Sequence, residues 1–205
     1  MIEREDLQEL LDRYGINIDK LIQNKDSIMI YGDYIRIKEN LEYLIDVLHL
    51  NVNAIERCPS ILYFRSKEEL ERNYHYLTEQ GISKEQMEKA LTAITSSPED
   101  LAYNYTYLKN RVGKEFISMH LSSLSTNPMD IKKICDILEK NFGKEKLLEC
   151  FSGALGIYSN YEDVERIVRL RVFEDHPELL TSSAFKQTAE EIEKIVRLKV
   201  FEDHP

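Results

Sequence analysis

Helix-start signals recur about every 30 residues along this chain, and that periodicity constrains its fold more than any other feature. Each signal is a capping side chain, and in all but the first a proline, an acid or an amide follows in the first helical turn. The signals fall at spacings of about 33, 31, 30, 33 and 28 residues, at Asp33, Ser66, Ser97, Asn127, Asn160 and Thr188. This period is typical of helical repeat arrays, in which each unit buries an apolar face against its neighbours.

The clearest copy of the unit runs from residue 66 to residue 98. Two capping boxes open its two predicted helices: Ser66 is followed three residues later by Glu69, and Ser83 by Gln86. A glycine separates the two helices and a proline follows the second. The pattern therefore predicts a pair of helices, each with one apolar stripe.

One phrase marks the end of the first helix in three units. It reads LDRYGIN from Leu11, IDVLHLN from Ile45 and LTEQGIS from Leu77. Glycine suits the left-handed residue that ends many helices, and the middle copy has His49 in its place. In the segment CPSIL at residues 58–62, the proline is expected to end the second helix of that unit, and the apolar pair Ile61-Leu62 to start a third, shorter element.

The C-terminal part contains two near copies. The sequence ERIVRLRVFEDHP at residues 165–177 returns as EKIVRLKVFEDHP at residues 193–205. Because the second copy stops inside a unit, we expect either that residues 160–205 belong to an array that continues in a longer parent chain, or that this end packs against something else. Taken together, the patterns predict an all-α superhelical array, or solenoid, of about six helix-pair or helix-triplet units in one domain over residues 1–205.

Composition limits the classes of protein to consider. The net charge is −10, whereas a free-standing nucleic-acid-binding protein is usually basic. The three cysteines are far apart and lack metal-ligand spacing, which favours a reduced intracellular protein. The N-terminus MIEREDLQEL has no signal or transit character, and no apolar run approaches the roughly 18 residues of a membrane span. We therefore expect a cytoplasmic location and no membrane partner.

Two segments carry a resemblance to a known family. CPSILYFRSKEELERNYHYLTEQGIS at residues 58–83 and SPEDLAYNYTYLKNRVG at residues 97–113 resemble the mitochondrial transcription termination factor (mTERF) family. As a pattern the resemblance covers residues 1–155. It implies a curved stack of helix triplets whose concave, basic face binds double-stranded DNA or RNA.

One stretch, residues 104–148, is locally basic, with eight basic against five acidic side chains. Its basic side chains are Lys109, Arg111, Lys114, Lys132, Lys133, Lys140, Lys144 and Lys146. They are the candidate contacts to nucleic-acid phosphates. Several fall near the predicted C-termini of first helices, where the helix dipole favours cations anyway, and this is the simpler explanation.

The sequence contains no catalytic constellation. It lacks GxSxG, HExxH and GxGxxG, and its histidines have no ligand-spaced partners. We therefore expect no enzyme activity, no cofactor and no metal site. Two functions stay open. The first is nucleic-acid binding by a segregated basic face, without chemistry. The second is a protein-binding scaffold or adaptor whose acidic surface meets a basic partner.

Overall fold

The computed structural model describes residues 4–17, 34–157, 161–169 and 194. Within these ranges the side chains of residues 4, 5, 144–157, 163, 166 and 167 are not described. No strand occurs among the described residues, so the all-α prediction is confirmed for them. The predicted helix starts at Asp33, Asn160 and Thr188 and almost all of the final copy lie outside this description.

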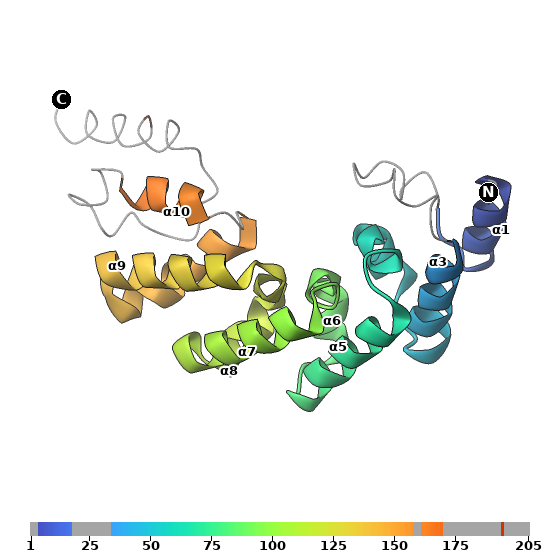
Figure 1. Cartoon of the computed structure of the whole chain (residues 1–205), viewed down its shortest axis with the longest axis horizontal. Coiled ribbons are helices and arrows are strands. Elements are labelled where there is room, and N and C mark those ends of the chain that lie inside the picture. The colour runs from blue at the N-terminus through green and yellow to red at the C-terminus, as the bar shows by residue number, and fades with distance from the viewer. Residues whose placement is uncertain (1–3, 18–33, 158–160, 170–193, 195–205) are drawn as a thin grey trace, which may run out of the picture. The chain divides into compact units, whose positions relative to one another are not determined.

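The chain divides into two units, Met1–Tyr103 and Asn104–Pro205. The first contains α1 (Arg4–Arg13), α3 (Tyr34–Leu41), the π-helical η2 (Glu42–Val47), α4 (Val52–Arg57), η3 (Pro59–Leu62), α5 (Lys67–Glu79), α6 (Lys84–Lys89) and η4 (Leu91–Ala93) (Figure 1). The second contains α8 (Lys114–Met119), η5 (Leu121–Ser125), α9 (Pro128–Ile157) and α10 (Tyr161–Val168). The boundary falls inside α7 (Pro98–Val112). Whether the chain is one domain stays a prediction.

The described part shows the same order of elements three times: a long helix, a six-residue helix and a 3-10 turn. The three sets are α3 with η2, α4 and η3; α5, α6 and η4; and α7, α8 and η5. The third, shorter element predicted in the segment 58–62 is present as η3, which begins at Pro59 and not, as predicted, at the apolar pair Ile61-Leu62. In the first unit α3 contacts α5, α4 contacts α6 and η3 contacts η4, so equivalent elements of successive sets lie against each other.

Apolar stripes of the helices form the core, as predicted for the pair of helices at residues 66–98. All three leucines of α1 are buried, as are most apolar side chains on the core-facing sides of the next two sets. These buried side chains are Leu7, Leu10, Leu11, Ile37, Leu41, Leu44, Leu70, Leu77, Met87, Leu91 and Ile94. Ile45, Leu48, Tyr74 and Ala90 of the same stripes are half-buried.

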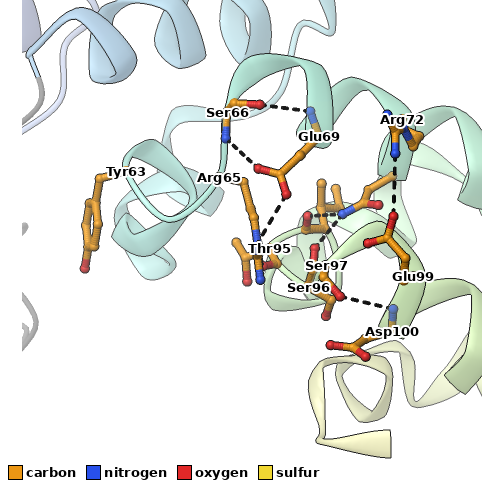
Figure 2. Close-up of polar contacts among 12 residues, drawn as sticks. Tyr63, Arg65, Ser66, Glu69, Arg72, Thr95, Ser96, Ser97, Glu99 and Asp100 are labelled. Carbon is orange, nitrogen blue, oxygen red and sulfur yellow. Dashed lines mark hydrogen bonds and ion pairs between the residues drawn. The ribbon is translucent and has the colours of Figure 1, made fainter.

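Both predicted capping boxes are confirmed. The Ser66 hydroxyl accepts from the backbone N–H of Glu69 at 3.3 Å, and the Glu69 carboxylate accepts from the Ser66 N–H at 3.1 Å (Figure 2). Ser83 and Gln86 repeat this exchange at α6. Ser97 caps α7 by accepting from the N–H of Asp100 at 3.1 Å. Reciprocal caps satisfy amide groups that the first helical turn leaves without partners, so they fix where these helices begin.

The residue that ends the first helix has a positive φ in all three copies of the shared phrase. The φ angles are 70° at Gly15, 52° at His49 and 78° at Gly81. Histidine therefore adopts the conformation that glycine adopts in the other two copies, at an energetic cost that its β-carbon imposes. Gly113 and Gly143 end the first helices of the next two units, with φ of 89° and 76°.

We expect His49→Gly to raise the free energy of unfolding by about 0.5–1 kcal/mol. Removing the β-carbon relieves about 1–2 kcal/mol of left-handed strain, and the backbone entropy of glycine offsets part of this gain. The contact that is lost, from His49 Nδ1 to the Ile45 carbonyl oxygen at 3.2 Å, is exposed. Urea unfolding followed by circular dichroism measures the change.

Gly15→Ala is the reciprocal control. A β-carbon at Gly15 would meet no atom within 4 Å, so the substitution adds strain without a clash. It is expected to lower the free energy of unfolding by about 1–2 kcal/mol. If both variants lose stability, the His49 imidazole contributes more than its backbone strain costs.

Three buried asparagines hold the 3-10 turns in place. Each donates its side-chain amide to backbone carbonyls about 20–25 residues later: Asn40 to Leu62 (3.0 Å) and Arg65 (2.9 Å), Asn73 to Ile94 and Ser96 (2.8 Å each), and Asn104 to Leu124 (3.0 Å) and Thr126 (2.8 Å). No more than 1% of any of these side chains is exposed. One amide thus ties each long helix to the turn that closes its own set, because the turn leaves these carbonyl groups without helical partners.

The same position in the next unit is Ile134, which is buried and has no amide to donate. The backbone of this unit also differs from that of the three earlier sets. After the interruption at Gly143, α9 runs on as a helix to Ile157, where the earlier sets have a short helix and a turn. The loss of the asparagine therefore coincides with the loss of the turn that it holds.

Glutamates link successive sets in the first unit. Glu56 of α4 accepts from the backbone N–H of Asn17 at 3.0 Å. Glu88 of α6 accepts from the backbone N–H of Asn51 at 2.8 Å. Glu56 and Glu88 each lie five residues after the cap of their own helix, so equivalent side chains reach back to equivalent amides of the preceding set.

Candidate functional site

Four of the candidate phosphate contacts are lysines of the second unit whose side chains are described and exposed. Lys114 begins α8, and Lys132, Lys133 and Lys140 lie on α9. Lys109, on α7, is exposed as well, with its ammonium 6.0 Å from the centre of the Tyr105 ring. Lys144 and Lys146 belong to α9 but lie outside the residues whose side chains are described.

Arg111, the candidate with the strongest phosphate-binding chemistry, is held within the protein. Its guanidinium donates to the carboxylates of Asp136 and Glu139 on α9 and, at 3.1–3.2 Å, to the hydroxyl of Tyr107. Two carboxylates therefore already neutralise this cation. Burial raises the pKa of Tyr107 to about 12, so the phenol stays protonated at neutral pH.

Lys133 is engaged more weakly. Its ammonium lies 4.2 Å from the centre of the Tyr161 ring, a cation–π contact between α9 and α10. Lys114, Lys132 and Lys140 have no carboxylate within ion-pair distance in the part of the chain whose side chains are described. Among the candidate side chains that the structure describes, these three are the most readily available to an anion.

Charge is unevenly distributed between the two units. Residues 1–103 contain 20 acidic and 12 basic side chains, whereas residues 104–205 contain 17 and 15. Most of the net charge of −10 is therefore carried by the first unit. A surface of this sign attracts cationic partners and repels phosphate groups.

An acidic hollow lies on the first unit. It has a volume of about 350 Å³ and is lined by Glu39, Glu42, Tyr43, Asp46, Val47 and Lys67. Glu39 belongs to α3, the next four residues to η2, and Lys67 to α5. Three carboxylates and one ammonium therefore surround the same small space.

Two tyrosines belong to this part of the first unit. The Tyr14 hydroxyl donates to Asp46 Oδ2 at 2.9 Å, and burial, followed by the Asp46 carboxylate, raises the pKa of Tyr14. Tyr43 is 3% exposed, and its hydroxyl has no hydrogen-bond partner among the described residues. Burial and the charge of Glu71 raise the pKa of Tyr43 to about 12. Both phenols are therefore neutral at physiological pH.

Large apolar side chains are exposed around these acidic positions. Ile35 is 68% exposed and Val47 is 63% exposed. Ile35, Glu39, Glu42 and Asp46 follow one another at intervals of four, three and four residues, which places them along one side of a helix. This signal is visible in the sequence, but the apolar stripe of the same helix draws attention to its opposite side.

No group of three or more histidine, cysteine, aspartate or glutamate side chains is placed to hold a metal ion in the described part of the chain. Among the described residues, no helix is both long enough and apolar enough to cross a membrane. No model of a known protein family matches the chain, and comparisons with curated proteins and with solved structures give no match either.

Proposed function

We propose that this chain is a non-catalytic, helical-repeat scaffold whose first unit binds a basic segment of a partner protein. In this proposal about six units form one superhelical array. The asparagine contacts repeat within each of three sets, and the glutamate contacts reach back along the chain; both support it, because an array consists of equivalent units that bond to their neighbours. These hydrogen bonds do not involve the exposed side chains of the helices, which therefore stay available for partners.

The observation that carries the proposal is the mixed surface along α3 and η2. Ile35 and Val47 are exposed on the same helical segment as the carboxylates of the hollow. These carboxylates outnumber the basic side chains that line it. Apolar side chains provide area to bury, and carboxylates provide complementarity to a basic partner. Phosphate binding would instead require the acidic unit to approach a polyanion.

Carbodiimide cross-linking after affinity capture tests this function. The reagent joins carboxylates directly to lysine ammonium groups in contact with them. We expect a captured partner to be cross-linked mainly to residues 34–47. In a parallel sample without the reagent, 0.5 M salt should release most of the partner, because screening weakens surface charge pairs. Cross-links confined to residues 104–205, or the absence of a stable partner, would contradict the proposal.

A second candidate function is binding of duplex DNA or structured RNA, as the resemblance to the mTERF family implies. The exposed Lys114, Lys132 and Lys140 favour it. Lysines that clamp phosphates should give a steep loss of affinity as salt rises. Lys132→Glu with Lys133→Glu should then weaken binding to all sequences alike, measured by fluorescence anisotropy. Absence of binding at low salt would exclude this candidate.

A further inference from the structure

We infer that the exposed side of α9 in one copy of this chain binds the exposed side of α3 and η2 in a second copy. The inference rests on the proposed function and names the partner, because α9 of the second copy supplies the basic segment. Three observations carry it: exposed apolar side chains at one repeat position, opposite charges at equivalent positions, and local pairing where the charges are alike.

The first observation is an exposed apolar side chain at the same repeat position of α3 and α9. The long helices can be aligned on their buried asparagines, whose place in α9 is taken by Ile134. Five residues before this place α3 has Ile35 and α9 has Met129, and each is 68% exposed. In α5 and α7 the same position is an exposed glutamate, Glu68 and Glu99. Only α3 and α9 among these four helices therefore offer apolar area here for a partner to bury.

The second observation is the opposite charge that follows on the same side of each segment. Four and eleven residues after the apolar side chain, α3 and η2 have Glu39 and Asp46, whereas α9 has Lys133 and Lys140. This spacing keeps all of them on one side of a helix, and all four charged side chains are exposed. Lys133 stays exposed in its cation–π contact with α10. When the two segments lie side by side and parallel, apolar meets apolar and each carboxylate meets an ammonium.

The third observation concerns the one position on this side that is acidic in both segments. It is Glu42 in η2 and Asp136 in α9. Each already has a cation from its own chain: Lys38 Nζ lies 3.8 Å from Glu42 Oε1, and the Arg111 guanidinium donates to Asp136. The like charges are therefore partly neutralised within each copy, which lowers the repulsion when the segments approach.

Two different surfaces meet in this contact, so it is heterologous. A copy that is bound through α9 still presents its own α3 and η2 to the next copy. Association therefore continues into a closed ring or an open chain, and the mean mass should rise with protein concentration. Salt should reverse most of the association, because it screens the exposed charge pairs.

Analytical ultracentrifugation of the full chain at low salt tests the contact by charge reversal. Glu39→Lys with Asp46→Lys, and Lys133→Glu with Lys140→Glu, each bring like charges together at both pairs. Each double variant alone should associate at least about tenfold more weakly than the unaltered chain. An equimolar mixture of the two should regain most of the association, because every reversed surface then meets its complement.

Met129→Glu tests the apolar part of the contact. It gives α9 the glutamate that α5 and α7 have at this position, and it should weaken association about tenfold by bringing a carboxylate to an acidic surface. Lys89→Glu with Lys109→Glu is the matched control for Lys133→Glu with Lys140→Glu, because it reverses the same charges at exposed lysines of α6 and α7. Away from the contact, this change should alter the dissociation constant less than about twofold at physiological salt.

Carbodiimide cross-linking of mixed ¹⁴N- and ¹⁵N-labelled chains locates the contact. We expect cross-links between residues 34–47 of one copy and Lys133 or Lys140 of another. Three results overturn the inference: a chain that stays monomeric at low salt and high concentration, an equal loss in the control at Lys89 and Lys109, or a mixture of reversed variants that regains nothing.

Affinity capture separates this failure from that of the proposed function. If the chain stays monomeric but captures a different protein through residues 34–47, only the contact between copies fails. If the chain stays monomeric and captures no partner, both proposals fail.

Discussion

Asn73→Asp is expected to lower the free energy of unfolding by about 3 kcal/mol or more at pH 7. The side-chain nitrogen of Asn73 donates to the carbonyl oxygens of Ile94 and Ser96, and the side chain is 1% exposed. An ionised carboxylate has no donor, so the substitution removes both hydrogen bonds and places a negative charge against two carbonyl oxygens. Chemical denaturation monitored by circular dichroism measures the loss.

The loss should depend on pH in a defined direction. Burial beside carbonyl oxygens raises the pKa of the introduced carboxyl in the folded state above its unfolded value of about 3.9. Below that value the group is neutral in both states, and the loss of stability is smallest. As the pH rises toward the folded-state pKa, the unfolded state releases its proton first and stability falls.

Asn53→Asp serves as the control for Asn73→Asp. It makes the same change of charge in the same unit, but at an exposed position of α4. Its effect should stay within about 0.5 kcal/mol, as for most surface substitutions. Equal losses in the two variants would mean that the added charge, and not the lost amide, causes the effect.

Ile61→Ala is expected to lower the free energy of unfolding by about 3 kcal/mol, within the range of about 2–5 kcal/mol for such truncations in cores. Ile61 is completely buried in η3, two residues after Pro59. Removing its side chain leaves a cavity next to the carbonyl groups that Asn40 holds. Urea unfolding followed by tyrosine fluorescence gives the change.

Ile35→Ala is the matched control for Ile61→Ala, because it removes the same atoms from a side chain that is 68% exposed. It should cost less than about 0.5 kcal/mol. A loss as large as that of Ile61→Ala would show that Ile35 is covered in solution, which would contradict its place on a binding surface.

The local signals in the sequence predicted the helix boundaries well. Ser66 with Glu69 and Ser83 with Gln86 form the expected capping boxes, and His49 has the positive φ of the glycines that it replaces. These features depend on residues within one turn of each other. A single sequence is sufficient to recognise them, because the atoms that interact are close in the chain.

The interactions that join distant segments could not be predicted in the same way. Asn73 appears in the sequence as a polar break in an apolar stripe, and its role depends on carbonyl groups more than 20 residues later. Arg111 was predicted as a phosphate contact, yet its guanidinium is bound by carboxylates 25 and 28 residues away. Whether Arg111 is available to a nucleic acid depends on these long-range contacts, which only the fold brings together.

The acidic hollow could be predicted only in part from the sequence. The spacing of Glu39, Glu42 and Asp46 along one helix is visible in the sequence. The depth of the hollow is not visible, since it also depends on Lys67 from α5 and on the burial of Tyr43. Spacing thus identifies a charged stripe, and packing decides whether that stripe encloses a space.

Glu56 and Glu88 both accept hydrogen bonds from backbone N–H groups that lie earlier in the chain, so these contacts of the first unit all run in one direction. Each set completes the amide bonding of the set before it, so trimming the chain from the C-terminal side leaves an orphaned N–H in the set that survives. Local unfolding that begins at the C-terminal side of this unit should therefore spread toward the N-terminus, one set after another.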